Sequence, residues 1–458
     1  MRTKILAAAI ATAAVASTVA GCGSSSGGGG GKTIKVVYEQ QLDSNNKVQA
    51  TFLAPLVKSF EKANPGTKVK LIPVTASEND YYTKIQLMMR SPVTAPDLVY
   101  EDTATINSDI ASGYLQPIDS YIKSWSDWSQ FATASQRAVT STKDGKVYGI
   151  PDSTDTRGLW YNKKLFAQAG IPVPWQPKTW DDVLTAARTI KAKLPGVTPF
   201  NVYTGTAGGE GSSMQGFEML LYGTPAADNS LYDASQKKWV IGSKGFKDAL
   251  QFVQTVYSTH LGPPVQQALG ANFGSMVGTE LIPDGKLAIN LDGSWAPNGW
   301  LRTGAKPWTQ WQSTMGMAAM PTQNGQAPGK VSMSGGWAWS IPAKSKNASL
   351  AFKFASYLES ESTSAKWNAV NADITPRKDS ATDPVYLNAL PTNKFFTALM
   401  SDTHYRPGLP EYTQVSTAIQ KAMESVTTGQ ASVDKAAATY DSDVKTAVGG
   451  SNTIQGAQ

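Results

Sequence analysis

Apolar residues recur along the chain with two different spacings. Short runs of β-branched and aromatic residues, such as residues 33–38 and 286–292, predict buried strands. Between such runs, apolar residues recur at about every fourth position, as over residues 48–60, which predicts a helix with one buried face. Because strands and helices alternate with short connections, the pattern predicts an α/β fold with mainly parallel sheets and helices on both faces.

The same spacings predict the other main elements. Strands are expected at residues 68–74, 97–100, 198–203, 315–320 and 335–341. Helices are expected around residues 81–88, 180–190, 246–257, 350–358, 415–426 and 433–444. Thr179 is a good N-cap for the second of these helices, because Asp181 and Asp182 fall in its positive first turn. A chain of this length is too long for one core, so we expect two lobes.

The first residues of the chain form a leader pattern. Arg2 and Lys4 precede an Ala-rich apolar run, and small residues lead into Cys22, the only cysteine. This pattern is typical of a lipoprotein signal peptide over residues 1–21, with a lipid attached to Cys22. A plain signal peptide or a membrane-spanning anchor are the alternatives, but the run is short for a span of about 20 strongly apolar residues. Residues 22–32 would then be the lipidated Cys and a flexible Gly/Ser tether.

Charge and chemistry exclude several classes of function. Removal of the leader takes away two basic residues and lowers the formal net charge from +6 to +4, and no basic run of the kind that binds nucleic acid is present. The two histidines, His260 and His404, are far apart in sequence and form no zinc signature, so we expect no metal and no cofactor. A Ser-His-Asp site or a pair of catalytic carboxylates stays formally open, because such groups meet in space and not in sequence.

Polar side chains follow two of the early strands. Glu39 and Gln40 come directly after the first strand, and Glu101 and Asp102 come directly after residues 97–100. Ligands of open α/β sheets bind beyond the carboxyl ends of the strands, which makes these four residues candidate ligand contacts. The alternative is that each is a solvated loop residue.

Tryptophan is abundant, with 13 residues. Trp295 follows the turn Asp-Gly-Ser over residues 292–294, and Trp337 follows two glycines. A tryptophan in this position can present its ring at a surface, and sugars combine an apolar C–H face with a rim of hydroxyls. Both residues are therefore candidate sugar contacts. The alternative is that they pack in the core or between lobes.

Residues 149–166 form an extended polar segment. Pro151 fixes one backbone angle and favours an extended chain before it, and a polar run covers residues 152–157. We expect this segment to join the two lobes with its polar side chains facing the cleft between them. Asp155 and Arg157 are candidate ligand contacts; alternatively Asp155 pairs with Arg157 and only orders the hinge.

Five segments of the chain occur in the order found in a known family. They read DGKVYGIP (144–151), LWYNKKLFAQAGIPVP (159–174), PKTWDDV (177–183), DGKLAINLDGSW (284–295) and GGWAWSIPAKSKNASLAFKF (335–354). Together they resemble the family 1 extracellular solute-binding proteins of bacterial ABC importers, the carbohydrate-binding family that includes maltose-binding protein. The resemblance covers nearly all of residues 33–447, and it implies two α/β lobes joined by hinge crossings, with a sugar bound between them.

The resemblance also implies lobe boundaries. The N-lobe would comprise residues 33–149 and 321–374, the C-lobe residues 150–320 and 375–447, and residues 448–458 would be a flexible tail. The crossings between lobes would fall near residues 149–152, 320–321 and 374–377.

The resemblance further assigns individual ligand contacts. It makes Asp155 and Glu210 acidic sugar ligands and Trp295 a stacking residue. The N-lobe ligand stretch Trp-Ala-His-Asp-Arg of maltose-binding protein is replaced here by residues 100–103, which read YEDT. The position of a late stacking tryptophan has Tyr412 as its nearest aromatic residue, which makes Tyr412 a further candidate. The sugar is therefore expected to differ from maltose.

The leading hypothesis is a monomeric, lipid-anchored sugar-binding subunit on the outer face of the cytoplasmic membrane. It would bind a mono- or oligosaccharide, deliver it to the transmembrane subunits of an ABC permease and catalyse no reaction. One alternative is a surface glycoside hydrolase that uses the same carboxylates and tryptophans. Another is the same fold with a peptide, polyamine or other small solute as ligand.

Overall fold

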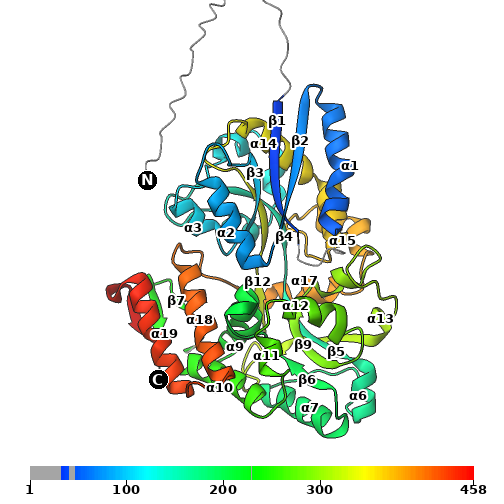
Figure 1. Cartoon of the computed structure of the whole chain (residues 1–458), viewed down its shortest axis with the longest axis vertical. Coiled ribbons are helices and arrows are strands. Elements are labelled where there is room, and N and C mark those ends of the chain that lie inside the picture. The colour runs from blue at the N-terminus through cyan, green and yellow to red at the C-terminus, as the bar shows by residue number, and fades with distance from the viewer. Residues whose placement is uncertain (1–31, 41–46, 228, 458) are drawn as a thin grey trace, which may run out of the picture.

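The computed structural model describes residues 32–40, 47–227 and 229–457 of the chain. The predicted signal peptide and Cys22 lie outside these residues. Figure 1 shows two lobes, each with a β-sheet and covering helices, which confirms the predicted two-lobed α/β fold. Among the helices in the described ranges, none is both long enough and apolar enough to span a bilayer.

The N-lobe is built on a five-stranded sheet. Its strands, in spatial order, are β2 (Thr67–Thr75), β1 (Lys32–Gln40), β3 (Leu98–Asp102), β13 (Gly336–Ser340) and β4 (Gly149–Thr154). β1 runs parallel to β2 and β3, whereas β13 runs antiparallel to both β3 and β4. The one reversed strand, β13, is the strand that enters this lobe from the other one.

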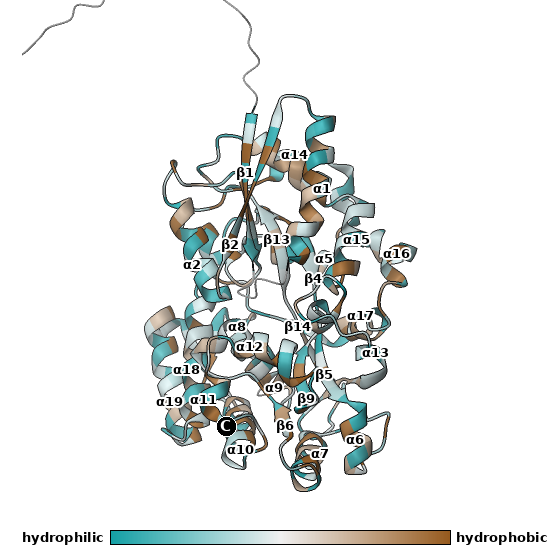
Figure 2. Ribbon diagram, turned by 45° about the vertical axis from the view of Figure 1, so that its right-hand side comes forward, coloured by the Kyte–Doolittle hydropathy of each residue, from teal (hydrophilic) through white to brown (hydrophobic). Residues whose placement is uncertain are grey.

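Helices cover both faces of the N-lobe sheet, because side chains of successive strand residues point to opposite faces. Val36 of β1 packs in a core with α1 (Val48–Ala63) and α14 (Ala348–Leu358). Val37, the next residue, packs in a second core with α2 (Glu78–Met89) on the other face. In Figure 2, α1 and α2 each contain both hydrophobic and hydrophilic residues.

The C-lobe is built on a four-stranded sheet. Its strands, in spatial order, are β10 (Met315–Ala318), β5 (Arg157–Asn162), β9 (Leu287–Gly293) and β6 (Thr198–Asn201). Again one strand, β5, runs against the others. The main covering helices are α6 (Lys163–Ala169), α7 (Trp180–Lys193), α10 (Lys244–Ser258), α18 (Tyr412–Thr427) and α19 (Val433–Val448). Thr179 caps α7 as predicted, in a reciprocal capping box with Asp182.

Shorter elements complete the fold. They are α3 (Ile106–Ala111), α4 (Asp119–Ile122), η1 (Ser126–Gln130), α5 (Thr133–Ala138), η2 (Thr206–Gly208), α8 (Gly209–Gly211), η3 (Ser212–Glu218), α9 (Met219–Leu221), β7 (Tyr232–Asp233), β8 (Lys238–Ile241), α11 (Val265–Ala268), α12 (Phe273–Met276), η4 (Val277–Leu281), η5 (Ala296–Trp300), α13 (Trp311–Thr314), β11 (Met320–Pro321), β12 (Lys330–Ser334), α15 (Glu361–Asn371), η6 (Ser380–Thr382), α16 (Pro384–Leu387), α17 (Asn393–Ala398), η7 (Leu399–Asp402), β14 (Thr403–Tyr405), η8 (Gly450–Asn452) and β15 (Thr453–Gln455).

The chain passes between the two sheets at two tight connections. β4 ends at Thr154 in the N-lobe sheet, and β5 begins at Arg157 in the C-lobe sheet. The return passage is at Gly335, since β12 pairs with β11 and β14, whereas β13 begins at Gly336 in the N-lobe sheet. Thr154 also pairs with Ile374, so a third segment of the chain contributes to the hinge.

This arrangement differs from the lobe boundaries that the family resemblance implied. Residues 321–334 were expected in the N-lobe, but Ser332 of β12 exchanges two hydrogen bonds of 2.9 Å with the backbone of Arg157 in β5. Residues after 374 were expected in the C-lobe, but Arg377 is paired with Asp127 of the N-lobe at 3.2 Å. Contacts between segments that are far apart in sequence decide to which lobe these residues belong. A local sequence pattern does not reveal such contacts.

The C-terminal residues differ from the expected flexible tail. α19 ends at Val448, and β15 then pairs in parallel with β8. The N–H of Gly456 donates to the carbonyl oxygen of Ile241 at 2.8 Å. A strand of three residues is too short for a periodic pattern to reveal.

Candidate functional site

A cleft of about 480 Å³ lies between the two lobes. Its N-lobe wall is formed by the ends of β1 and β3, the start of α2 and the start of β13. Its C-lobe wall is formed by α8, the end of β9 and the segments η4 and η5. The residues predicted from sequence that line this cleft are Glu39, Gln40, Asp102, Asp155, Arg157, Glu210, Trp295 and Trp337.

Two predicted contacts do not line the cleft. Glu101 is fully buried beneath it, because neighbouring strand residues point to opposite faces and Asp102 takes the cleft side. Burial and the neighbouring Asp109 raise the pKa of Glu101 well above its usual value. Tyr412 is buried at the start of α18, where its hydroxyl lies 3.0 Å from Glu210 Oε2 and 2.6 Å from Glu218 Oε1. Tyr412 therefore does not line the cleft itself, but its hydroxyl contacts Glu210, which does.

Asp155 and Arg157 form a buried ion pair at the first connection between the lobes. The same carboxylate accepts the N–H of Gly335 at 2.9 Å, and so links both connections. Arg157 Nε donates to Gln215 Oε1 at 2.9 Å. The pairing that the sequence left as an alternative is thus present, while both side chains still line the cleft.

Trp295 and Trp337 are half-buried rings on opposite sides of the cleft. The guanidinium of Arg157 lies over the ring of Trp295, with Cζ 4.7 Å from the ring centre. Trp337 stacks on Tyr100, with ring centres 4.8 Å apart and planes 6° apart. Each ring is held in place by a neighbour and keeps part of its surface exposed, so each provides a fixed aromatic plate.

Arg406 is a cleft residue that the sequence interpretation missed. Its guanidinium lies 2.8 Å from Asp102 Oδ1, 2.7 Å from Thr103 Oγ1 and 3.2 Å from Glu210 Oε2. Asp102 belongs to the N-lobe and Glu210 to the C-lobe. Burial lowers the pKa of Arg406, but Asp102 and Glu210 raise it by more, so Arg406 stays charged. No periodic pattern surrounds Arg406, and its partners are 304 and 196 residues away.

The N-lobe side of the cleft also has an acidic wall, formed by Glu39 and Asp102, which were predicted from the sequence, and by Glu78, which was not. Burial, together with the charges of Glu78 and Asp102, raises the pKa of Glu39 to about 8. Burial and Asp102 raise the pKa of Glu78 to about 7. The hydroxyl of Tyr82 joins two of these groups, 2.6 Å from Glu78 Oε1 and 2.8 Å from Asp102 Oδ2. Near neutral pH this wall can both donate and accept hydrogen bonds.

A comparison with known protein families identifies the family of this chain. The family model described as bacterial extracellular solute-binding protein matches residues 43–365. The chain belongs to this family.

Relatives of this solute-binding protein span most of its length. The galactooligosaccharide-binding protein of Bacillus subtilis (strain 168) is 25% identical over 446 residues, which cover 94% of this chain and 96% of the relative. The multiple sugar-binding protein of Streptococcus mutans is 25% identical over 358 residues, which cover 74% of this chain and 75% of that protein.

Solved structures share the fold of this solute-binding protein. A Thermotoga lettingae ABC transporter solute-binding protein bound with α-D-tagatose superposes with a TM-score of 0.78 at 24% identity, over 91% of this chain and all of that one. The GacH receptor of Streptomyces glaucescens, solved without ligand and with acarbose, superposes with a TM-score of 0.76 at 22% identity, over 91% and 98% of the two chains.

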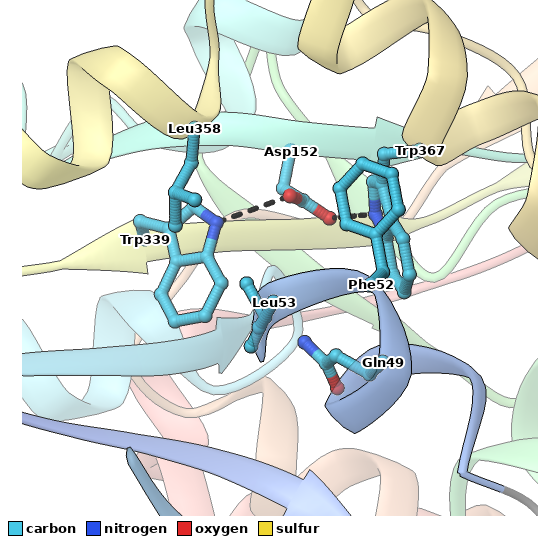
Figure 3. A pocket seen from close by; sticks show the side chains of 7 residues that line it. All are labelled: Gln49, Phe52, Leu53, Asp152, Trp339, Leu358 and Trp367. Atoms are coloured by element: carbon cyan, nitrogen blue, oxygen red, sulfur yellow. Dashed lines mark hydrogen bonds between the residues drawn. The ribbon is translucent and has the colours of Figure 1, made fainter. Parts of the chain in front are cut away.

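The hinge of this solute-binding protein contains a buried carboxylate, Asp152. Figure 3 shows it between two indoles: Trp339 Nε1 donates to Oδ1 at 3.0 Å, and Trp367 Nε1 donates to Oδ2 at 2.7 Å. The hydroxyl of Tyr100 donates to Oδ2 at 2.6 Å. Phe52 and the neighbouring apolar side chains enclose the group. These donors fix the hinge strand β4 to β3, β13 and α15.

The histidines of this solute-binding protein lie away from the cleft. His404 stacks on Tyr222, with ring centres 4.5 Å apart, and burial lowers its pKa. His260 is an exposed residue that follows α10, with a positive φ of 55°. Within the described ranges, no group of three or more His, Cys, Asp or Glu side chains is placed to hold a metal ion.

Proposed function

We propose that this protein is the sugar-binding subunit of an ABC importer and captures a mono- or oligosaccharide in the cleft between its lobes. The observation that carries the proposal is the pairing of two fixed, half-exposed tryptophans, Trp295 and Trp337, with the many carboxylates of the same cleft. A sugar ring offers an apolar face to an aromatic plate and hydroxyls to polar side chains. The cleft volume of about 480 Å³ lies within the usual range for small-molecule sites.

Relatives support the choice of a sugar over other solutes. The Bacillus subtilis relative is named for galactooligosaccharides and the Streptococcus mutans relative for multiple sugars. The neighbouring structures hold α-D-tagatose and acarbose.

The cleft residues have distinct roles in this proposal. Trp295 and Trp337 stack on sugar faces. Asp155, held by Arg157 and by the N–H of Gly335, accepts sugar hydroxyls in charge-assisted hydrogen bonds. Glu39 and Gln40 extend the polar wall at the end of β1. A ligand that touches both walls favours the closed arrangement of the lobes by its higher affinity for that state.

The protein works at the membrane surface in this proposal and carries out no reaction itself. Lipid on Cys22 and the Gly/Ser tether hold the monomeric protein on the outer face of the cytoplasmic membrane, where the closed form docks on the permease. The support is the leader pattern of residues 1–22 and the family of extracellular solute-binding proteins to which the chain belongs.

A thermal-shift screen followed by product analysis tests the proposal. The purified protein is heated with monosaccharides, with galacto- and malto-oligosaccharides, and with peptides and polyamines as the competing classes. A ligand that binds only the folded state raises the melting temperature. We expect a sugar to give the largest rise, and chromatography to recover that sugar unchanged after long incubation. A rise only with a peptide or polyamine, or the appearance of hydrolysis products, would refute the proposal.

A further inference from the structure

The cleft holds far more negative than positive side chains. Among the described residues that line it, the carboxylates are Glu39, Glu78, Asp102, Asp155, Glu210, Asp292 and Asp373, and the cationic groups are Arg157 and Arg406. Arg157 is paired within its own hinge segment, with Asp155. Arg406 is paired with carboxylates of both lobes.

The segment that carries Arg406 belongs to the C-lobe and reaches the N-lobe. It begins at β14, which pairs with β12, and the hydroxyls of Thr403 and Ser334 lie 2.7 Å apart. Two residues after Arg406, the backbone at Gly408 lies against the N-lobe. A Cβ added to Gly408 would lie 3.5 Å from Asn107 Nδ2. Arg406 is therefore anchored in one lobe at the point where the chain meets the other.

The two carboxylates that contact Arg406 are already engaged by protein groups. In Asp102, Oδ1 accepts the N–H of Ala104 at 2.6 Å in addition to Arg406, and Oδ2 lies 2.8 Å from the hydroxyl of Tyr82. In Glu210, Oε1 accepts the hydroxyl of Ser416, and Oε2 faces both Arg406 and Tyr412. Every carboxylate oxygen of Asp102 and Glu210 thus has a polar partner within the protein.

We infer that Arg406 is a positioning residue that couples ligand binding to lobe closure, because it joins Asp102 and Glu210 in a bridge that exists only when the lobes are closed. One guanidinium cannot stay in contact with carboxylates on both lobes once the lobes separate. The bridge therefore stabilises the closed arrangement, and Asp102 and Glu210 serve mainly to hold the lobes together. This inference rests on the proposed function only in taking closure as the ligand-binding step.

Removal of the charge of Arg406 should oppose closure. Asp102 and Glu210 would then face each other across the cleft without their shared cation. Like charges brought together in a buried site repel one another strongly. When closing costs more free energy, the affinity for a ligand that requires the closed state falls by the same factor as the closed population.

Small-angle scattering and a distance measurement between labels on the two lobes test this inference, both without ligand and with the sugar that most raises the melting temperature. Arg406→Met keeps the length of the side chain and removes the bridge. Arg377→Met is the matched control, because Arg377 is also buried and paired, but with Asp127 and Asp379 on its own side of the hinge. We expect Arg406→Met to increase the radius of gyration and the distance between lobes, and Arg377→Met to change stability only.

Partner variants test the bridge itself. Asp102→Asn should open the lobes less than Arg406→Met. Adding Asp102→Asn to Arg406→Met should recover part of the closure, because it removes the repulsion across the cleft. A folded Arg406→Met variant with unchanged lobe separation would overturn the inference. If Arg406→Met does not fold, Arg406→Lys keeps the charge with fewer directed donors, and its lobe separation should lie between closed and open; an unchanged separation would again overturn the inference.

These results separate the bridge from the proposed function. If wild-type protein binds no sugar but Arg406→Met still opens, the function fails and the bridge stands. If wild-type protein binds sugar and Arg406→Met is as closed as wild type, the bridge fails and the function stands.

Discussion

The hydroxyl of Tyr100 lies 2.6 Å from Oδ2 of Asp152, so the end of β3 is tied to the hinge strand β4. The ring of Tyr100 stacks on Trp337, which lines the cleft. One side chain therefore contacts both the hinge and the candidate binding surface. The two contacts of Tyr100 can be tested separately, because its hydroxyl bonds to the hinge residue Asp152 and its ring stacks on the cleft residue Trp337.

Tyr100→Phe should destabilise the protein and leave ligand binding nearly unchanged. The variant keeps the stacked ring but removes a side-chain donor to the buried carboxylate of Asp152, which also accepts from the indoles of Trp339 and Trp367. A buried acceptor that loses its partner costs about 1–3 kcal/mol of unfolding free energy. Urea unfolding and calorimetric titration measure the two effects. Unchanged stability, or an affinity loss greater than tenfold, would show that the hydroxyl does not act through the hinge.

Trp295→Ala should weaken sugar binding by about 1–3 kcal/mol, as other losses of aromatic stacking do, without unfolding the protein. Trp308→Ala is the matched control, because Trp308 packs against Trp300 and lies outside the group of residues that line the cleft. Calorimetric titration with the best sugar from the screen measures both variants. Equal affinity in folded Trp295→Ala and wild type would remove Trp295 from the site.

Asp155→Asn should reduce both affinity and stability. The substitution keeps the shape but removes the charge that sugar hydroxyls would bind, so we expect affinity to fall at least about tenfold. It also leaves the buried guanidinium of Arg157 without its anion, so the unfolding free energy should fall as well. Lower stability with intact affinity would make Asp155 a residue of the hinge only.

Glu218→Gln should flatten the pH dependence of stability. Burial raises the pKa of Glu218 to about 8, and the charge of Glu210 adds to this, although the hydrogen bond from Tyr412 lowers it. An unfolded glutamate titrates near pH 4.3, so between about pH 5 and 8 the folded state binds a proton that the unfolded state releases. Stability contributed by this group is therefore lost as pH rises.

Denaturant unfolding at several pH values between 5 and 8 measures this effect. The slope for wild type should be steeper than that for Glu218→Gln, by up to roughly 1.4 kcal/mol per pH unit. Other carboxylates with raised pKa values titrate equally in both proteins and cancel in the difference. Parallel curves for the two proteins would show that Glu218 does not hold a proton in the folded state.

Cys22→Ser should prevent lipid attachment. The variant should accumulate in the medium or as unprocessed precursor, whereas wild type should partition into the detergent phase. Metabolic labelling with a fatty acid, followed by fractionation, gives the result. A Cys22→Ser variant that is processed normally and stays on the membrane would exclude the lipoprotein pattern as the cause of anchoring.

Local patterns predicted the elements well because burial in this fold follows the periods of helices and strands. The spacing over residues 48–60 and the N-cap at Thr179 depend only on neighbours in sequence, and α1 and α7 form there.

The site was only partly predictable for a physical reason. The rule for strand ends located Asp102 and Glu39 correctly at the cleft, but it could not tell Asp102 from Glu101, because the covering elements decide which face is buried. The abundance of tryptophan did not by itself indicate a binding site, because Trp160 and other tryptophans pack in the C-lobe core. The local sequence around Arg406 did not indicate a role in the site, because that role depends on its ion pairs with Asp102 and Glu210, which lie in different lobes.

A crystal structure with the sugar that most raises the melting temperature tests the central claim most directly. The account predicts density for that sugar in the cleft, with a ring against Trp295 or Trp337 and hydroxyls within hydrogen-bond distance of Asp155. It also predicts that the lobes are closed and that Arg406 contacts both Asp102 and Glu210. A sugar bound outside the cleft, or a cleft that stays empty at saturating sugar, would contradict the account.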